Sequence, residues 1–199
     1  MTPSPLALLI AAVLSSLSIA CDAGETVPHL TVGTQEIGLS AGYLISSRLT
    51  DQHSTKQSGP AIMPSWAMVL TDPIGWRWLR GHLMLGAEIV YIQFQEPVVT
   101  HGVGFAPKIK YSFVALDRIH PYAEFAGGPF WTDLAGNIPE QHSQFNFILM
   151  GGLGISYFMT EGFAINAGYR FQHISNAHTS KPNVGLNSSL PFAGFSFYF

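Results

Sequence analysis

The segment from Phe163 to Ser175 reads FAINAGYRFQHIS and alternates between two kinds of side chain. Successive side chains of a β-strand point to opposite faces, so residues two apart share a face. Counting back from Ser175, one face carries His173, Phe171, Tyr169, Ala167, Ile165 and Phe163, and the other carries Ile174, Gln172, Arg170, Gly168, Asn166 and Ala164. A base and a nucleophile on the apolar face of a strand would be unusual in a water-soluble enzyme, where that face packs into the core. They make sense if that face is the outside of a membrane barrel.

The same period of two recurs along the rest of the chain between turn signals. It predicts eight strands, over Glu36–Ser46, Ala61–Leu70, His82–Gln93, His101–Phe113, Ile119–Phe130, Phe145–Met159, Phe163–Ser175 and Leu186–Phe199.

The polar faces of these segments indicate how the sheet closes. They carry charged and amide side chains, namely Glu88, Lys108, Lys110, Glu124, Asn146, Asn166 and Arg170. The sequence therefore predicts an all-β fold, an eight-stranded antiparallel transmembrane β-barrel of the bacterial outer membrane, with a filled interior in which these charges pair. The alternative is a soluble barrel with its polar face outside. The low charged content of 11%, the 47% of hydrophobic residues and the small residues on the polar face disfavour it.

The N-terminus is the one apolar run close to the length of a membrane helix. We expect residues 1–23 to be a secretory signal peptide, although its first residues carry no Lys or Arg, and residues 24–199 to form the barrel. Cys21, the single cysteine, allows either lipidation or ordinary cleavage after Ala20 or Ala23. The net charge of -3 gives no basic excess, so we expect no nucleic-acid partner.

Connection lengths orient the barrel. The joins near Asp117 and Gly162 are short, whereas those over residues 47–60, 131–144 and 176–185 are long. Outer-membrane barrels keep short turns in the periplasm and long loops outside, which places Ser175 at the outer leaflet. The join over residues 71–81 is an exception in length, and we expect its aromatic and basic residues, Trp76, Arg77, Trp78 and Arg80, to anchor at the interface.

Two short motifs carry a resemblance to a known family. The sequence HISNA at residues 173–177 is followed by PNVGLN at residues 182–187 and by a last strand closing on Phe199. Together they resemble the signature of the lipid A 3-O-deacylase (PagL) family. The resemblance implies an eight-stranded outer-membrane barrel that hydrolyses an ester-linked acyl chain of lipid A with a Ser-His-Glu triad facing the lipid. It implies lipid A, the membrane anchor of lipopolysaccharide, as the partner, implies no cofactor or metal, and leaves a homodimer open.

The resemblance also implies roles for individual residues. Ser175 would be the nucleophile, His173 the general base, and Asn176 an oxyanion donor through its side-chain amide. Asn183 and Gly185 match the turn of the family motif. For these two residues ordinary turn chemistry is at least as good an explanation as a direct role in catalysis.

The chain departs from the family at the acid. Twelve residues after the serine, where the family carries glutamate, this chain has Asn187. Alternation places Asn187 on the outward face beside His173, where its amide oxygen could accept the ring N–H but supplies no negative charge. Other candidates are Glu140 or Asp133 from a loop, or a dyad without an acid. Glu88 and Glu124 read as interior residues.

Two classes of function remain. One is a serine esterase that removes the 3-O-linked acyl chain of lipid A, and the other is a non-enzymatic structural or adhesive barrel that keeps the motif after losing its acid. The remaining histidines show no metal-ligand spacing on one face; among them His178 is the one nearest the site in sequence.

Overall fold

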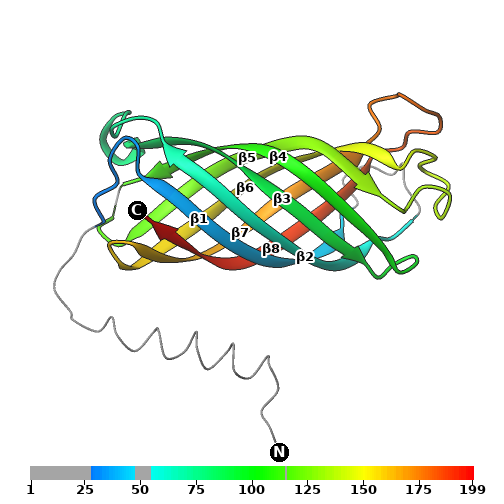
Figure 1. Cartoon of the computed structure of the whole chain (residues 1–199), viewed down its shortest axis with the longest axis horizontal. Coiled ribbons are helices and arrows are strands. Elements are labelled where there is room, and N and C mark those ends of the chain that lie inside the picture. The colour runs from blue at the N-terminus through cyan, green and yellow to red at the C-terminus, as the bar shows by residue number, and fades with distance from the viewer. Residues whose placement is uncertain (1–27, 48–54, 115) are drawn as a thin grey trace, which may run out of the picture.

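The computed structural model describes residues 28–47, 55–114 and 116–199. Eight strands close into one antiparallel barrel in which each strand pairs with its neighbours in sequence and β8 pairs with β1 (Figure 1). The strands are β1 (Gln35–Ser46), β2 (Ser58–Val69), β3 (Gly81–Phe94), β4 (Thr100–Phe113), β5 (Ile119–Thr132), β6 (Phe145–Thr160), β7 (Phe163–Ser175) and β8 (Leu186–Tyr198). The predicted fold class is confirmed.

The predicted strand bounds hold within one or two residues, except at the start of β2. That strand begins at Ser58, three residues before the predicted Ala61. Gly59 and Pro60 are strong turn signals in a sequence, yet here they pair with Leu44 and Tyr43 of β1. Closure of the barrel overrides the local preference of this dipeptide. If this part of β1 were unpaired, its backbone N–H and C=O groups would lack hydrogen bonds at an edge that faces the membrane.

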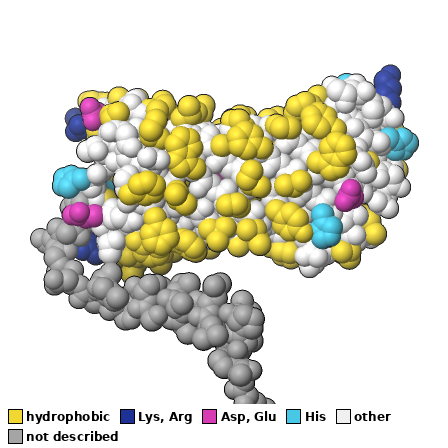
Figure 2. Space-filling model, in the orientation of Figure 1, with side chains coloured by type: hydrophobic (Ala, Val, Ile, Leu, Met, Phe, Trp, Pro, Cys, Tyr) yellow, Lys and Arg dark blue, Asp and Glu magenta, His cyan; other side chains and the backbone are white. Residues whose placement is uncertain are grey.

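The outside of the barrel is apolar along its length. Side chains such as Phe125, Leu153 and Ile165 project outward, and Leu153 is 68% exposed. Figure 2 shows hydrophobic side chains spread over the barrel wall, with charged and histidine side chains at the two ends. This distribution matches a surface solvated by lipid in its middle and by headgroups or water at its rims. No α-helix in the described ranges is long and apolar enough to span a membrane.

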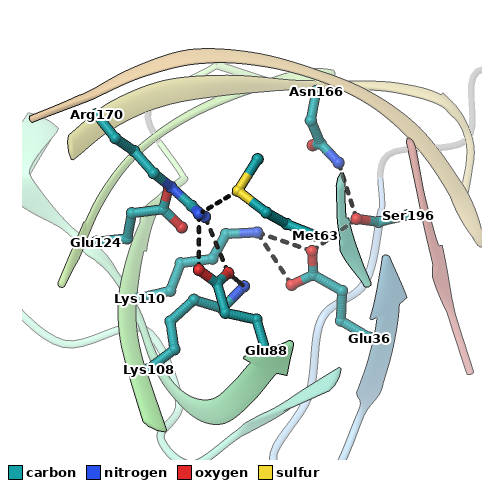
Figure 3. Close-up of polar contacts among 9 residues, drawn as sticks. All are labelled: Glu36, Met63, Glu88, Lys108, Lys110, Glu124, Asn166, Arg170 and Ser196. Carbon is teal, nitrogen blue, oxygen red and sulfur yellow. Dashed lines mark hydrogen bonds and ion pairs between the residues drawn. The ribbon is translucent and has the colours of Figure 1, made fainter. Parts of the chain in front are cut away.

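The interior is filled by charged side chains and by two apolar clusters, of which the smaller includes Met84, Phe158 and Tyr198. Arg170 of β7 pairs with Glu88 of β3 at 2.7 Å and with Glu124 of β5 at 2.8 Å (Figure 3). Lys108 also contacts Glu88 at 3.4 Å, and Lys110 pairs with Glu36 of β1 at 3.0 Å. The prediction that the mixed charges pair inside is confirmed. Toward the long-loop end, buried apolar side chains fill the barrel, among them Phe94, Phe130, Leu134, Ile148 and Ile174.

The two ends of the barrel differ as the sequence predicts. The long joins β1–β2, β5–β6 and β7–β8 lie at one end of the barrel. The start of β1 and the C-terminus of the chain lie at the other end, where Gln35 N donates a hydrogen bond to Phe199 O (Figure 1). At that second end the 3₁₀ helix η1 (Arg77–Leu79) follows Trp76. Trp76 and Trp78 are each 71% exposed, and the Arg77 guanidinium lies 4.6 Å from the Trp76 ring centroid. The anchoring role of this turn stays a prediction, and residues 1–23 with Cys21 lie outside the described residues.

Candidate active site

Strand register brings His173 and Asn187 together on the lipid-facing surface. The two residues are direct cross-strand partners between β7 and β8. His173 Nδ1 lies 2.7 Å from Asn187 Oδ1. An amide oxygen can only accept a hydrogen bond, so Nδ1 carries the hydrogen, and in the neutral imidazole Nε2 then has the lone pair. The contact expected from alternation is present, and it sets the imidazole tautomer that a general base needs.

Ser175 is the last residue of β7, two positions beyond His173 and on the same face. It lies opposite Phe147 of β6, at the long-loop rim of the barrel. Among the described residues, Ser175 Oγ has no hydrogen-bond partner, and both His173 and Ser175 are half-buried. Same-face neighbours on a strand have Cα atoms roughly 7 Å apart, so side-chain rotation can bring the hydroxyl to the imidazole.

Gly185 packs against the histidine ring. A Cβ placed on Gly185 would overlap His173 Cε1 and approach Nε2 to 2.9 Å. A side chain at this position would therefore force the imidazole or the loop to shift. The sequence left Gly185 open between turn chemistry and a direct catalytic role, and it does not reveal which ring this glycine must accommodate.

The asparagines at the start and end of the β7–β8 loop hold its shape. Asn183 Oδ1 accepts a hydrogen bond from the backbone N–H of Asn176 at 2.9 Å. The fully buried Asn176 side chain donates through Nδ2 to Ser180 O at 3.1 Å. Between them Ala177 and His178 adopt left-handed conformations, with φ of 51° and 63°. Asn176 Nδ2 also lies 3.4 Å from Ser180 Oγ, so the side-chain amide is committed to the loop, which supports a structural role. Its oxyanion role stays a prediction.

The two alternative acids, Glu140 and Asp133, lie in the β5–β6 loop. The Glu140 carboxylate accepts hydrogen bonds from Thr55 N at 2.9 Å and Thr55 Oγ1 at 2.8 Å, and its backbone oxygen accepts from Val184 N. Gln141 beside it forms a bridge with Asn183 and donates to Ile174 O. The β5–β6 loop therefore packs on the β7–β8 loop next to Gly185. Asp133 is exposed on the same loop, and its backbone oxygen accepts from Asn137.

The described residues contain no group of three or more His, Cys, Asp or Glu side chains that could hold a metal ion. The chemistry available at this rim is that of a histidine, a serine and hydrogen-bonding amides.

Fold and comparisons together define the class of the protein. An eight-stranded barrel with an apolar outside and a filled, charged inside is an outer-membrane β-barrel of the Gram-negative type. A family model described as lipid A 3-O-deacylase (PagL) matches residues 61–196. The chain belongs to this family.

Solved structures support the fold. The crystal structure of the outer membrane enzyme PagL is 22% identical with a TM-score of 0.53, covering 80% of this chain and 97% of that one. The structure of Neisserial surface protein A is 19% identical with the same TM-score, covering 84% and 97%. No curated protein matches the chain. At these identities the structural likeness concerns the barrel and not the chemistry.

Proposed function

We propose that this barrel is a serine esterase of the outer leaflet that removes the 3-O-linked acyl chain of lipid A. Family membership supports the substrate class. The observation that carries the proposal is the 2.7 Å contact between His173 Nδ1 and Asn187 Oδ1, made beside Ser175 on a surface that faces lipid. An ester at the boundary between headgroup and acyl chain would meet these side chains without leaving the membrane.

The reaction follows from the positions of the three side chains. His173 Nε2 takes the proton of Ser175 Oγ as that oxygen attacks the ester carbonyl carbon. When the tetrahedral intermediate collapses, the C–O bond to the sugar breaks and the imidazolium returns the proton to the leaving oxygen. Water, deprotonated by the same imidazole, then attacks the acyl carbonyl carbon. The bond from that carbon to Ser175 Oγ breaks, and the imidazolium returns the proton to Oγ as the fatty acid leaves. The Asn176 side-chain amide would stabilise the oxyanion once one of its N–H groups turns from Ser180 toward the ester.

Asn187 keeps the imidazole in the reactive tautomer without stabilising its cation. A neutral amide in the third position has a precedent in Cys-His-Asn sites. The proposed enzyme therefore works with an orienting group in place of an acid. All three side chains come from one chain, so the mechanism does not require the homodimer that the family resemblance leaves open.

Mass spectrometry of lipid A from a Gram-negative host tests the proposal. Cells expressing the wild-type barrel should lose one acyl chain from the 3-position, and Ser175→Ala should restore the full spectrum. Ser189→Ala is a matched control, because Ser189 is half-buried on the outward face of β8 and its hydroxyl contacts Tyr169 rather than His173. Heat-modifiable migration on gels would establish that each variant is folded.

An unchanged spectrum from a folded wild-type barrel would support the second candidate, a non-enzymatic barrel. The observation that favours this candidate is the amide at position 187, where the family motif carries an acid.

A further inference from the structure

A groove of about 280 Å³ lies on the lipid-facing surface of β3 to β6, away from the residues of the candidate site. Its lining side chains are apolar: Ile89, Val103, Phe105, Pro129, Trp131 and Phe145. A lipid-facing hollow of this kind loses packing contacts unless an apolar chain fills it.

The groove and Ser175 belong to one continuous surface. Phe147 is the cross-strand partner of Ser175 on one side and of Pro129 on the other. The Phe147 ring packs edge-on against Phe145 with centroids 5.3 Å apart, and Phe145 packs in the same way against Trp131 at 6.4 Å. The distance around the barrel from β7 to the part of the groove on β4 and β5 is two to three strand spacings, or roughly 10–14 Å.

A polar pair lies at the rim end of the groove. Tyr91, the cross-strand partner of Val103, places its hydroxyl 2.7 Å from His101 Nδ1. The two rings stack with centroids 5.9 Å apart and an interplanar angle of 22°. Both side chains are exposed on the outward face, and His101 is the second residue of β4 at the long-loop end. Amphipathic rings at this level present polar atoms to headgroups and apolar bodies to acyl chains.

We propose that this groove binds a second, uncleaved acyl chain of the lipid A molecule whose ester lies at Ser175. Tyr91 and His101 are positioning residues that hydrogen-bond an oxygen at the head of that chain. The inference rests on the proposed function for the identity of the lipid. The separation around the barrel favours a disaccharide headgroup with several chains, because the short glycerol backbone of a two-chain phospholipid would not bridge it. The groove would thus align the scissile ester and discriminate lipid A from phospholipids.

Photo-crosslinking tests occupancy without requiring catalysis. In the Ser175→Ala background, p-benzoylphenylalanine replaces either Trp131, a large ring that already lines the groove, or Leu153, which faces lipid on β6 outside it. Purified barrel in detergent is mixed with sub-stoichiometric lipid A. Crosslinks should be enriched at position 131 and competed by unlabelled lipid A but not by phospholipid. His101→Ala should weaken capture about fivefold, as expected for one lost hydrogen bond. Equal yields at the two positions, or equal competition by phospholipid, would overturn the proposal.

Kinetics give the second measurement. Val103→Trp fills the groove, and Leu153→Trp is the matched control on the same outer surface. Val103→Trp should lower kcat/KM for lipid A by about tenfold, through a higher KM. The added ring competes with the acyl chain for the groove, and overpacking of this kind weakens binding by about tenfold or more. Hydrolysis of a nitrophenyl ester with a single acyl chain should be unchanged in Leu153→Trp and should fall much less than lipid A hydrolysis in Val103→Trp. Equal loss on both substrates would refute the role in positioning.

The two experiments separate the two proposals. If the wild-type barrel hydrolyses neither substrate while lipid A still crosslinks selectively at position 131, the esterase is refuted and the lipid site stands. If hydrolysis occurs without selective crosslinking, the esterase stands and the groove proposal fails.

Discussion

Replacing Asn187 by aspartate exchanges an amide NH₂ for an oxygen and leaves the length and branching of the side chain unchanged. The oxygen that lies 2.7 Å from His173 Nδ1 would keep its position and gain a negative charge. Asn187→Asp is therefore a closer isostere than Asn187→Glu, which restores the residue of the family motif but adds a methylene.

The size of the gain can be worked out from this geometry. A carboxylate and an imidazolium about 4 Å apart at an effective dielectric constant near 20 attract by about 4 kcal/mol. Asn187 is only 8% exposed, so desolvation of the carboxylate offsets part of this attraction. A net transition-state stabilisation of about 1.4–2.7 kcal/mol would raise the rate about ten- to a hundredfold. The acid-to-amide change in a serine protease costs about 10⁴-fold, an upper limit because there the amide also fixes the wrong tautomer.

The assay uses refolded barrel in detergent with purified lipid A and follows fatty-acid release. Asn187→Asp should exceed the wild-type rate, Asn187→Glu should exceed it if the longer side chain reaches Nδ1, and Asn187→Ala should fall below it because the ring loses its acceptor. Identical rates for wild type, Asn187→Asp and Asn187→Ala would refute the reasoning. The third group would then have to be a loop acid, with Glu140 tested next, or the site would be a dyad.

Three further changes test other parts of the structure. Gly185→Ala should reduce lipid A hydrolysis about a hundredfold, the effect of a displacement near 1 Å at a catalytic group, while gel migration of the folded barrel stays normal. Leu153→Arg should impair membrane assembly, since Arg facing lipid near the midplane costs roughly 2–4 kcal/mol; normal assembly in vesicles would contradict the assigned facing. Arg170→Leu leaves two buried glutamates without their shared partner and should lower unfolding free energy in urea titrations by about 3–5 kcal/mol, whereas exposed Arg77→Leu should change it little.

The strands were accessible to sequence reasoning because the bilayer enforces alternation. In β7 every second residue from Phe163 to Ser175 faces lipid, and the predicted bounds coincide with the observed ones. The same alternation placed Asn187 on the outward face, where the register makes it the partner of His173. The start of β2 was missed because Gly59 and Pro60 signal a turn locally, whereas the pairing with β1 that overrides them is a tertiary effect.

The loop part of the site was not predictable in the same way. The Glu140 carboxylate accepts a hydrogen bond from Thr55, 85 residues away in the sequence, and its backbone oxygen accepts one from Val184. The position of Glu140 therefore depends on how the loops pack on the folded barrel. No periodicity records such contacts. The close approach of Gly185 to the imidazole is equally invisible in a sequence, since a glycine reads as a turn signal wherever it occurs.

The interior ion pairs couple strands that are far apart in the chain. Arg170 and Glu88 are separated by 82 residues, and Lys110 and Glu36 by 74. A partly assembled sheet would hold the anions of β1 and β3 before the cations of β4 and β7 arrive, and a lone charge in hydrocarbon costs several kcal/mol. We therefore expect insertion and closure to be coupled, with the open sheet staying hydrated until these ion pairs can form. Weakening these pairs should consequently slow biogenesis even where the finished barrel tolerates the change.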